Sequence, residues 1–184
     1  SKKATSDKLT GSIYSSLKNN KIILIFIYEN NVFKIENGNF RSNFLDGKID
    51  GIVKFIPFFD FNINLDSKIL NLKKIETAVL QLDKTSRKKL FLINKKINGS
   101  LNIYINKIYS NTRLINSLES RLEFNNGNLL VNQLLLDLGK LGAADITGTL
   151  NNEKNSTIFF FKKNLFIEKL RIFFNKFWIY KKPE

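Results

Sequence analysis

The residues that could carry out chemistry are few in this chain and are not grouped. It has no histidine and no cysteine, so general acid–base catalysis near neutral pH, thiol nucleophiles and the usual zinc ligands would all fall to carboxylates, Lys or Tyr. The eight Asp and eight Glu residues are scattered, and most stand beside a basic residue or in a turn. The sequence therefore predicts no catalytic residues, no metal site and no cofactor, and we expect the protein not to be an enzyme.

One glycine-rich stretch, NGNLLVNQLLLDLGKLGAADITGTL over residues 126–150, raises the question of a phosphate-binding loop, since it holds four of the nine glycines. Such a loop needs G-x-G-x-x-G or G-x-x-x-x-G-K-[ST] between a strand and a helix, so that backbone N–H groups meet the phosphate. Here the glycines of GKLG at 139–142 lead into AADITGTL, which alternates like another strand. The stretch is better explained as two strands and their corners.

The glycines of this stretch then have individual structural roles. Asn126-Gly127 predicts a hairpin turn, where Gly tolerates positive φ. Gly139 and Gly142 are expected to bracket a second short turn. Gly148 stands inside an alternating segment, where it predicts a bulge or a close approach of two backbones.

The elements that would have to position any site are mostly strands, because apolar residues alternate along much of the chain. Three segments, 101–105, 118–124 and 144–150, alternate most clearly, and their apolar side chains predict one dry face. Its candidate members are Ile103, Ile105, Leu118, Leu122, Phe124 and Ile146. Further strands are expected over 10–18, 21–29, 31–36, 39–46, 48–56, 58–66 and 156–167.

Short polar breaks separate these strands and predict hairpins, so that strands adjacent in sequence should be neighbours in a long antiparallel meander. The breaks include Asn19-Asn20, Glu29-Asn30-Asn31 and Asp46-Gly47. Two helices interrupt the pattern, near 68–83 and near 168–178. The first is expected to follow an N-cap at Asp66-Ser67 and to end before the basic run Arg87-Lys88-Lys89.

The second helix has two open interpretations. Its apolar stripe can pack against the sheet, or it can lie in the headgroup region of an anionic membrane, with basic residues on its other side. The candidate membrane-contact residues are Lys169, Arg171, Phe173, Phe177 and Trp178. The longest apolar run, Ile22–Tyr28, has seven residues, far short of the ~20 that a membrane-spanning helix needs.

These patterns predict a mainly β fold with two short helices, in a single β-rich domain over residues 1–184. A meander of about ten strands must cover its apolar face, and two helices are too little. We expect a curved open sheet that forms a groove, with a closed β-sandwich or barrel as the alternative. The net charge of +14 and the 17 Phe raise nucleic-acid binding, but the basic residues are spread along the chain and most Phe occupy apolar positions, so the sequence does not favour it.

Three segments resemble the AsmA-like proteins of Gram-negative envelopes in their glycine placement and strand pattern. They are SRLEFNNGNLLVNQLLLDLGKLGAADITGTL (120–150), NGNFRSNFLDGKIDGIVKFIPFFDFNINLD (37–66) and KKINGSLNIYINKIYS (95–110). Together they cover most of residues 35–150. The resemblance is to the C-terminal region of that family.

The resemblance implies a segment of a longer protein of the bacterial cell envelope, tethered to the inner membrane by an N-terminal helix and facing the periplasm. It implies a β-sheet groove that binds phospholipid acyl chains and acts in outer-membrane biogenesis, with the membrane surface and other envelope proteins as further partners. Because Ser1 is not a start methionine, we expect this chain to be a piece of such a protein, tethered by a part that it lacks. A structural β-scaffold that binds other proteins is the alternative function.

Overall fold

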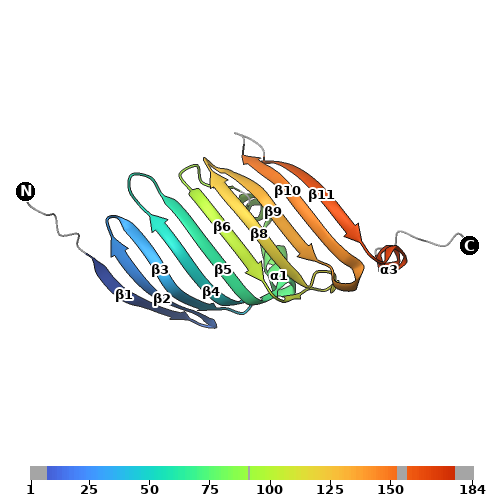
Figure 1. Cartoon of the computed structure of the whole chain (residues 1–184), viewed down its shortest axis with the longest axis horizontal. Coiled ribbons are helices and arrows are strands. Elements are labelled where there is room, and N and C mark those ends of the chain that lie inside the picture. Colours follow the sequence, from blue (N-terminus) through green and yellow to red (C-terminus); the bar gives the residue numbers. More distant parts are fainter. Residues whose placement is uncertain (1–7, 91, 153–156, 177–184) are drawn as a thin grey trace, which may run out of the picture.

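A computed structural model of the chain describes residues 8–90, 92–152 and 157–176, and these form one open, twisted sheet accompanied by short helices (Figure 1). The strands are β1 (Leu9–Leu17), β2 (Asn20–Glu29), β3 (Val32–Arg41), β4 (Leu45–Lys54), β5 (Asp60–Asn71), β6 (Asn98–Ile105), β7 (Ile108–Tyr109), β8 (Ser117–Asn125), β9 (Asn128–Asp137), β10 (Gly142–Asn152) and β11 (Thr157–Ile167). The helices are α1 (Leu72–Gln81), α2 (Lys84–Lys89) and α3 (Leu170–Lys176), with a 3-10 turn, η1, at Gly139–Leu141.

The sheet is long and does not close on itself. Its order is β1-β2-β3-β4-β5-β6-β8-β9-β10-β11, and β7 pairs beside the end of β5. Strands β1 and β11 therefore lie at opposite edges (Figure 1). The prediction of a mainly β, open, curved meander is confirmed, and the closed sandwich or barrel is excluded. Three short helices accompany the sheet in place of the two expected.

One long strand pair departs from the predicted meander, and the short pair of β5 with β7 is parallel as well. β5 and β6 are parallel, with Ile63 opposite Leu101 and Leu65 opposite Ile103, whereas the other long pairs are antiparallel. Two parallel neighbours cannot be joined by a hairpin and need a crossover of a dozen or more residues. Helices α1 and α2 are that crossover, so the helical interruption seen in the sequence marks the point where strand direction repeats.

The predicted start and end of the first helix are wrong. β5 continues through Asp66 and Ser67 to Asn71, and the side chain of Asn71 caps α1 by accepting a hydrogen bond from the N–H of Lys74 at 3.2 Å. α1 ends at Gln81, and the basic run lies within the separate helix α2. The i, i+3 and i, i+4 apolar spacing reaches back to Ile69, which is why the pattern alone extended the helix into the strand.

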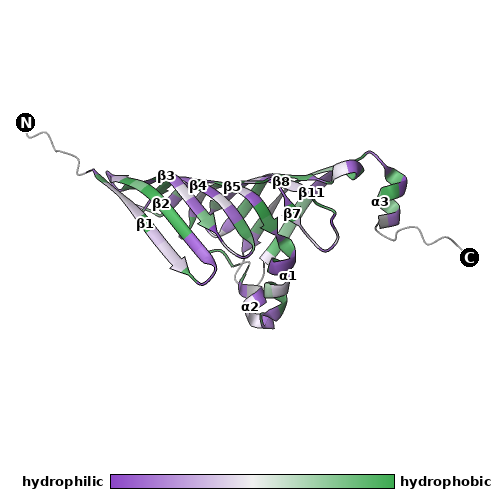
Figure 2. Ribbon diagram, turned by 90° about the horizontal axis from the view of Figure 1, so that it is seen from below, coloured by the Kyte–Doolittle hydropathy of each residue, from purple (hydrophilic) through white to green (hydrophobic). Residues whose placement is uncertain are grey.

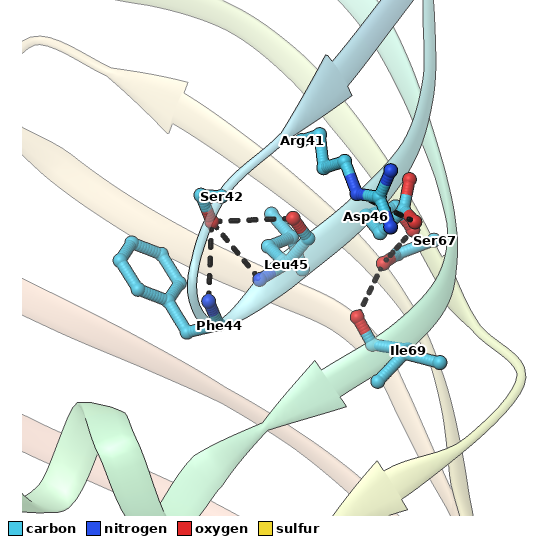
Figure 3. A network of polar contacts seen from close by, with 7 residues as sticks. All are labelled: Arg41, Ser42, Phe44, Leu45, Asp46, Ser67 and Ile69. Carbon is cyan, nitrogen blue, oxygen red and sulfur yellow. Dashed lines mark hydrogen bonds and ion pairs between the residues drawn. The ribbon is translucent and has the colours of Figure 1, made fainter. Parts of the chain in front are cut away.

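The break predicted at Asp46-Gly47 is also wrong. Residues 39–41 of the predicted strand 39–46 belong to β3 together with residues 32–36, and the turn to β4 consists of Ser42, Asn43 and Phe44. Figure 3 shows how this turn is held: Ser42 Oγ accepts from the N–H groups of Phe44 and Leu45 at 3.3 and 3.0 Å. Gly47 lies within β4, opposite Ser67, and a side chain there would collide with the backbone of Asp66, whose carbonyl oxygen is 2.1 Å from the Cβ position.

The predicted corners of the glycine-rich stretch are confirmed. Asn126 and Gly127 have φ of 50° and 84° and form the two-residue turn between β8 and β9. Gly139 and Gly142, with φ of 60° and 126°, bracket η1. Gly148 lies at a register shift in the β9–β10 pair, and its Cβ position is 2.3 Å from the carbonyl oxygen of Phe160. The expected bulge and the expected close approach therefore occur together.

The three helices lie on one side of the sheet (Figure 2). That side carries the apolar face, because Phe173 of α3 packs into a buried cluster with Leu138, Leu141 and Ala144. The half-buried stripe of α1, which includes Ile75 and Val79, agrees with this placement. α1 itself contains no buried residue, so the crossover covers only part of the face that it crosses.

Candidate functional site

The candidate site is the apolar face of the sheet, which strand pairing assembles in continuous rows. One row crosses the whole sheet and consists of Ile13, Leu24, Gly38, Ile49, Leu65, Ile103, Ser120, Leu134, Ile146 and Lys163. A second row nearer the β4–β5 loop consists of Leu9, Tyr28, Phe33, Val53, Phe61, Gly99, Phe124, Leu129, Leu150 and Phe159. Facing residues share one side of a sheet, so both rows present a single surface.

The six residues predicted from alternation all lie on this face. Ile103 is opposite Ser120, and Ile105 is opposite Leu118. The remaining three, Leu122, Phe124 and Ile146, occupy the same face on β8 and β10 through their pairing with β6 and β9. The structure therefore brings together the members that sequence reasoning assigned to one surface.

The apolar face is incompletely covered. Ile105 is buried, but Ile103, Leu118, Leu122 and Phe124 are only half-buried although they lie in the middle of the sheet. Among the described residues no second sheet packs against them, and the helices reach only parts of the face (Figure 2). Antiparallel sheets of ordinary domains cover their apolar face with another layer. In this sheet, no layer of the described residues covers a broad part of the apolar face.

Small residues shape this face. Six of the nine glycines occupy strand positions at which a side chain would point to this face, namely Gly11, Gly38, Gly47, Gly51, Gly99 and Gly148. At Gly38 an added Cβ would lie 2.4 Å from Cγ2 of Ile49 and 2.7 Å from Cδ2 of Leu24. These neighbours occupy the space that a side chain would need, so the missing side chains let large apolar residues on both flanking strands lean together.

Two buried serines interrupt the apolar surface, and both are satisfied by backbone. Ser67 is fully buried, and its Oγ lies 2.9 Å from the carbonyl oxygens of both Asp46 and Ile69 (Figure 3). Ser120 Oγ donates to the carbonyl of Gln133 at 3.1 Å, beside a register shift between β8 and β9. Their hydroxyls hold irregular strand geometry and are not aimed at a ligand.

An aromatic row joins the loop between β4 and β5 to the apolar face. Ring centroids are 6.0 Å apart from Phe55 to Phe59, 6.0 Å from Phe59 to Phe61, and 5.6 Å from Phe61 to Phe124. Sequence reasoning identified Phe124 but missed the other three. The contact between Phe61 and Phe124 depends on the β5–β6–β8 pairing, for which the local sequence carries no pattern.

Over β4, β5 and β6 the opposite face is largely polar and offers little chemistry, whereas on β2 and β11 it also exposes apolar side chains such as Ile23, Ile25 and Phe166. Asn102 Nδ2 donates to Asn64 Oδ1, and Asn64 Nδ2 donates to Asp50 Oδ2, each at 2.9 Å, which links β6, β5 and β4. Two open hollows of about 620 and 640 Å³ lie over this part of the face and are lined mostly by such polar side chains. Within the described ranges, no three His, Cys, Asp or Glu residues are placed to hold a metal ion.

Asp83, the N-cap of α2, carries the one carboxylate with a clearly displaced pKa in the part of the chain that the structure describes. The hydroxyl of Ser86 donates to Asp83 Oδ2 at 2.6 Å, and the N–H groups of Ser86 and Thr85 donate to Oδ1. These hydrogen bonds favour the charged form and hold the pKa of Asp83 below its usual 3.8. The group caps a helix in solvent and lies outside the apolar face.

The predicted membrane-contact set is only partly accessible. Lys169 and Arg171 are exposed, whereas Phe173 is buried and lies edge-on to Phe174 with ring centroids 6.0 Å apart. The expectation that Phe173 meets a membrane is therefore wrong, and the sheet-packing interpretation holds for it. Phe177 and Trp178 lie outside the described residues.

Comparison of the chain with protein-family models, curated proteins and solved structures gives no match. None of the described helices has both the length and the apolar character to cross a bilayer.

Proposed function

We propose that the apolar face binds the acyl chains of phospholipids, and that the chain is a non-enzymatic lipid-binding or lipid-transfer segment. The observation that supports this is the open apolar surface running across the sheet, with half-buried Ile103, Leu122 and Phe124 at its centre. Exposure of such a surface to water is unfavourable, and a bound acyl chain would remove it from water without requiring directional contacts. Burial would contribute roughly 0.8 kcal/mol per methylene group.

The resemblance of residues 35–150 to AsmA-like proteins supports the same proposal from a separate direction. In that setting the segment acts on the periplasmic side of the bacterial envelope, in phospholipid movement and outer-membrane biogenesis. It would be tethered to the inner membrane by a part outside this chain. Headgroups would remain in solvent, near basic side chains at the open ends of the strands.

The test is lipid content and lipid uptake. The purified chain is extracted and its extract analysed for phospholipids by mass spectrometry, and the delipidated chain is then titrated with a fluorescent phospholipid. We expect co-purified lipid and saturable uptake. A chain that carries no lipid and takes up none would contradict the proposal.

A structural scaffold that binds another protein is the second candidate, and the edge strand β1 favours it. β1 reads LTGSIYSSL, with no charged residue and no proline to discourage pairing with a further strand. This function predicts capture of a β-strand at the edge. Strand capture should not depend on the residues of the apolar face, whereas lipid uptake should. Substitutions at Leu122 therefore separate the two functions.

A further inference from the structure

The loop between β4 and β5 exposes a concentration of large apolar side chains. Residues 55–59 read FIPFF, and Phe55, Ile56, Phe58 and Phe59 are 52, 62, 75 and 37% exposed. Single apolar residues at a surface need no explanation, but a contiguous exposed group marks a place of interaction. The strands on either side do not need this loop to be apolar, because a hairpin connection is ordinarily built from polar residues, Gly and Pro.

The loop is continuous with the apolar face. The aromatic row described above begins at Phe55 and Phe59 in the loop and reaches Phe61 and Phe124 on the face, with each neighbouring pair of rings within contact range. An apolar molecule that meets the exposed loop therefore meets an unbroken aromatic surface leading onto the sheet.

Basic side chains accompany the loop at this end of the sheet. Lys54 directly precedes it, and Lys95 and Lys96 lie in the connection that enters β6, whose Asn98 is opposite Asp60. All three lysines are exposed; the acidic residues at this end are Asp60, next to the loop, and Glu123, which lines the same hollow as Lys54 and Asp60. Apolar and aromatic side chains beside lysines are the combination that inserts at the surface of an anionic bilayer.

We propose that the Phe55–Phe59 loop docks on a phospholipid bilayer, inserting its apolar tip below the headgroups, and that the aromatic row is the passage between that bilayer and the apolar face. The proposal rests on the proposed lipid-binding function, because the bilayer is taken as the source or destination of the bound lipid. A protein partner for the loop is the competing outcome, and protein-free vesicles decide between them.

The first test is flotation of the purified chain with vesicles of phosphatidylcholine and phosphatidylglycerol in equal parts. The double variant Ile56→Ser, Phe58→Ser should bind roughly tenfold more weakly or worse, because it removes two inserted side chains. Replacing Lys95 with Glu should weaken binding about fivefold or more. The matched control is Phe160→Ser, Phe166→Ser: both rings are 60% exposed on the side of β11 that points away from the apolar face, and this variant should bind as wild type does. Equal binding of the loop variant, or no binding of the wild type, would overturn the proposal.

A second readout uses the single tryptophan of the chain. In a Trp178→Phe background, Phe58→Trp places a unique indole at the loop tip. Its emission should shift to shorter wavelength on addition of vesicles and should be quenched by brominated acyl chains. If vesicles bind but the emission of this indole stays that of a water-exposed side chain, the loop is not the docking element.

Different results would contradict lipid binding by the apolar face and bilayer docking by the Phe55–Phe59 loop. Binding of a monomeric fluorescent fatty acid, without vesicles, measures the apolar face alone, and the Ile56→Ser, Phe58→Ser variant should retain it. A wild-type chain that floats with vesicles but binds no fatty acid would remove the lipid-binding function and the passage along the aromatic row, and would leave only the docking of the loop. A loop variant that loses both activities would show that the loop is part of the binding face, and docking would be abandoned.

Discussion

The rings of Phe61 and Phe124 lie 5.6 Å apart although their strands, β5 and β8, do not pair with each other. Between them runs β6, and the residue opposite both is Gly99. Since Gly99 has no side chain, the two rings meet across the strand that separates them. This contact completes the aromatic row that leads from the β4–β5 loop to the middle of the sheet.

Replacing Gly99 with Val should destabilise the sheet. The Cβ position lies 2.2 Å from the carbonyl oxygen of Phe61 and 2.8 Å from its ring, and φ is 140°, a conformation that residues with side chains avoid. We expect the free energy of unfolding in urea to fall by about 2–3 kcal/mol. Gly11→Ala is the control, because its Cβ would first meet the tip of the Phe26 ring at 2.9 Å, which can move. Equal losses for the two variants would contradict this account.

Lipid uptake should depend on which face carries a substitution. Leu122→Lys places an ammonium group among Leu101 and Val131 on the apolar face, where a bound acyl chain would desolvate it. We expect uptake of a fluorescent phospholipid to fall at least tenfold while circular dichroism stays that of the folded sheet. The control, Tyr104→Lys, changes an exposed residue of the polar face and should leave uptake unaltered.

Ser67 should matter for stability although its face is otherwise apolar. Its hydroxyl is fully buried and satisfies the carbonyl of Asp46 or Ile69 at the irregular end of the β4–β5 pair. Ser67→Ala should lower the free energy of unfolding by about 1–2 kcal/mol, since a buried carbonyl loses its donor. Ser12→Ala, in the exposed edge strand β1, should change it little. A neutral Ser67→Ala would mean that water replaces the hydroxyl.

Alternation and turn residues were enough to predict the strands and the face. In 118–124 every second residue is apolar or small, and pairing with β6 and β9 puts all of these on one side. Asn126-Gly127 predicted its turn because few residues other than Asn and Gly accept positive φ in succession. Both features are local, so the sequence carries them without knowledge of partners.

The features that sequence reasoning missed are set by distant pairing. β5 continues past Ser67 because β4 on one side, and β6 and β7 on the other, supply its hydrogen-bonding partners. Locally, Asp66-Ser67 is equally typical of a helix N-cap. Gly47 resembles a turn residue in sequence, yet it lies in β4 opposite Ser67, where the backbone of Asp66 and Ser67 leaves no room for a side chain.

Phe173 supplies the last prediction, because its burial separates packing from membrane contact in α3. The ring is 8% exposed and closes a cluster with Leu138, Leu141 and Ala144 at the end of β9 and β10. Phe173→Ala should cost about 3 kcal/mol of local stability and speed amide hydrogen exchange at Leu138 and Ala144. Ile172→Ala is the matched control, since Ile172 is 51% exposed on the same helix and should leave exchange unchanged. Vesicle binding should survive both substitutions, because the docking loop lies in the β4–β5 connection. Faster exchange in the Ile172 variant than in the Phe173 variant would show that the other face of α3 packs on the sheet.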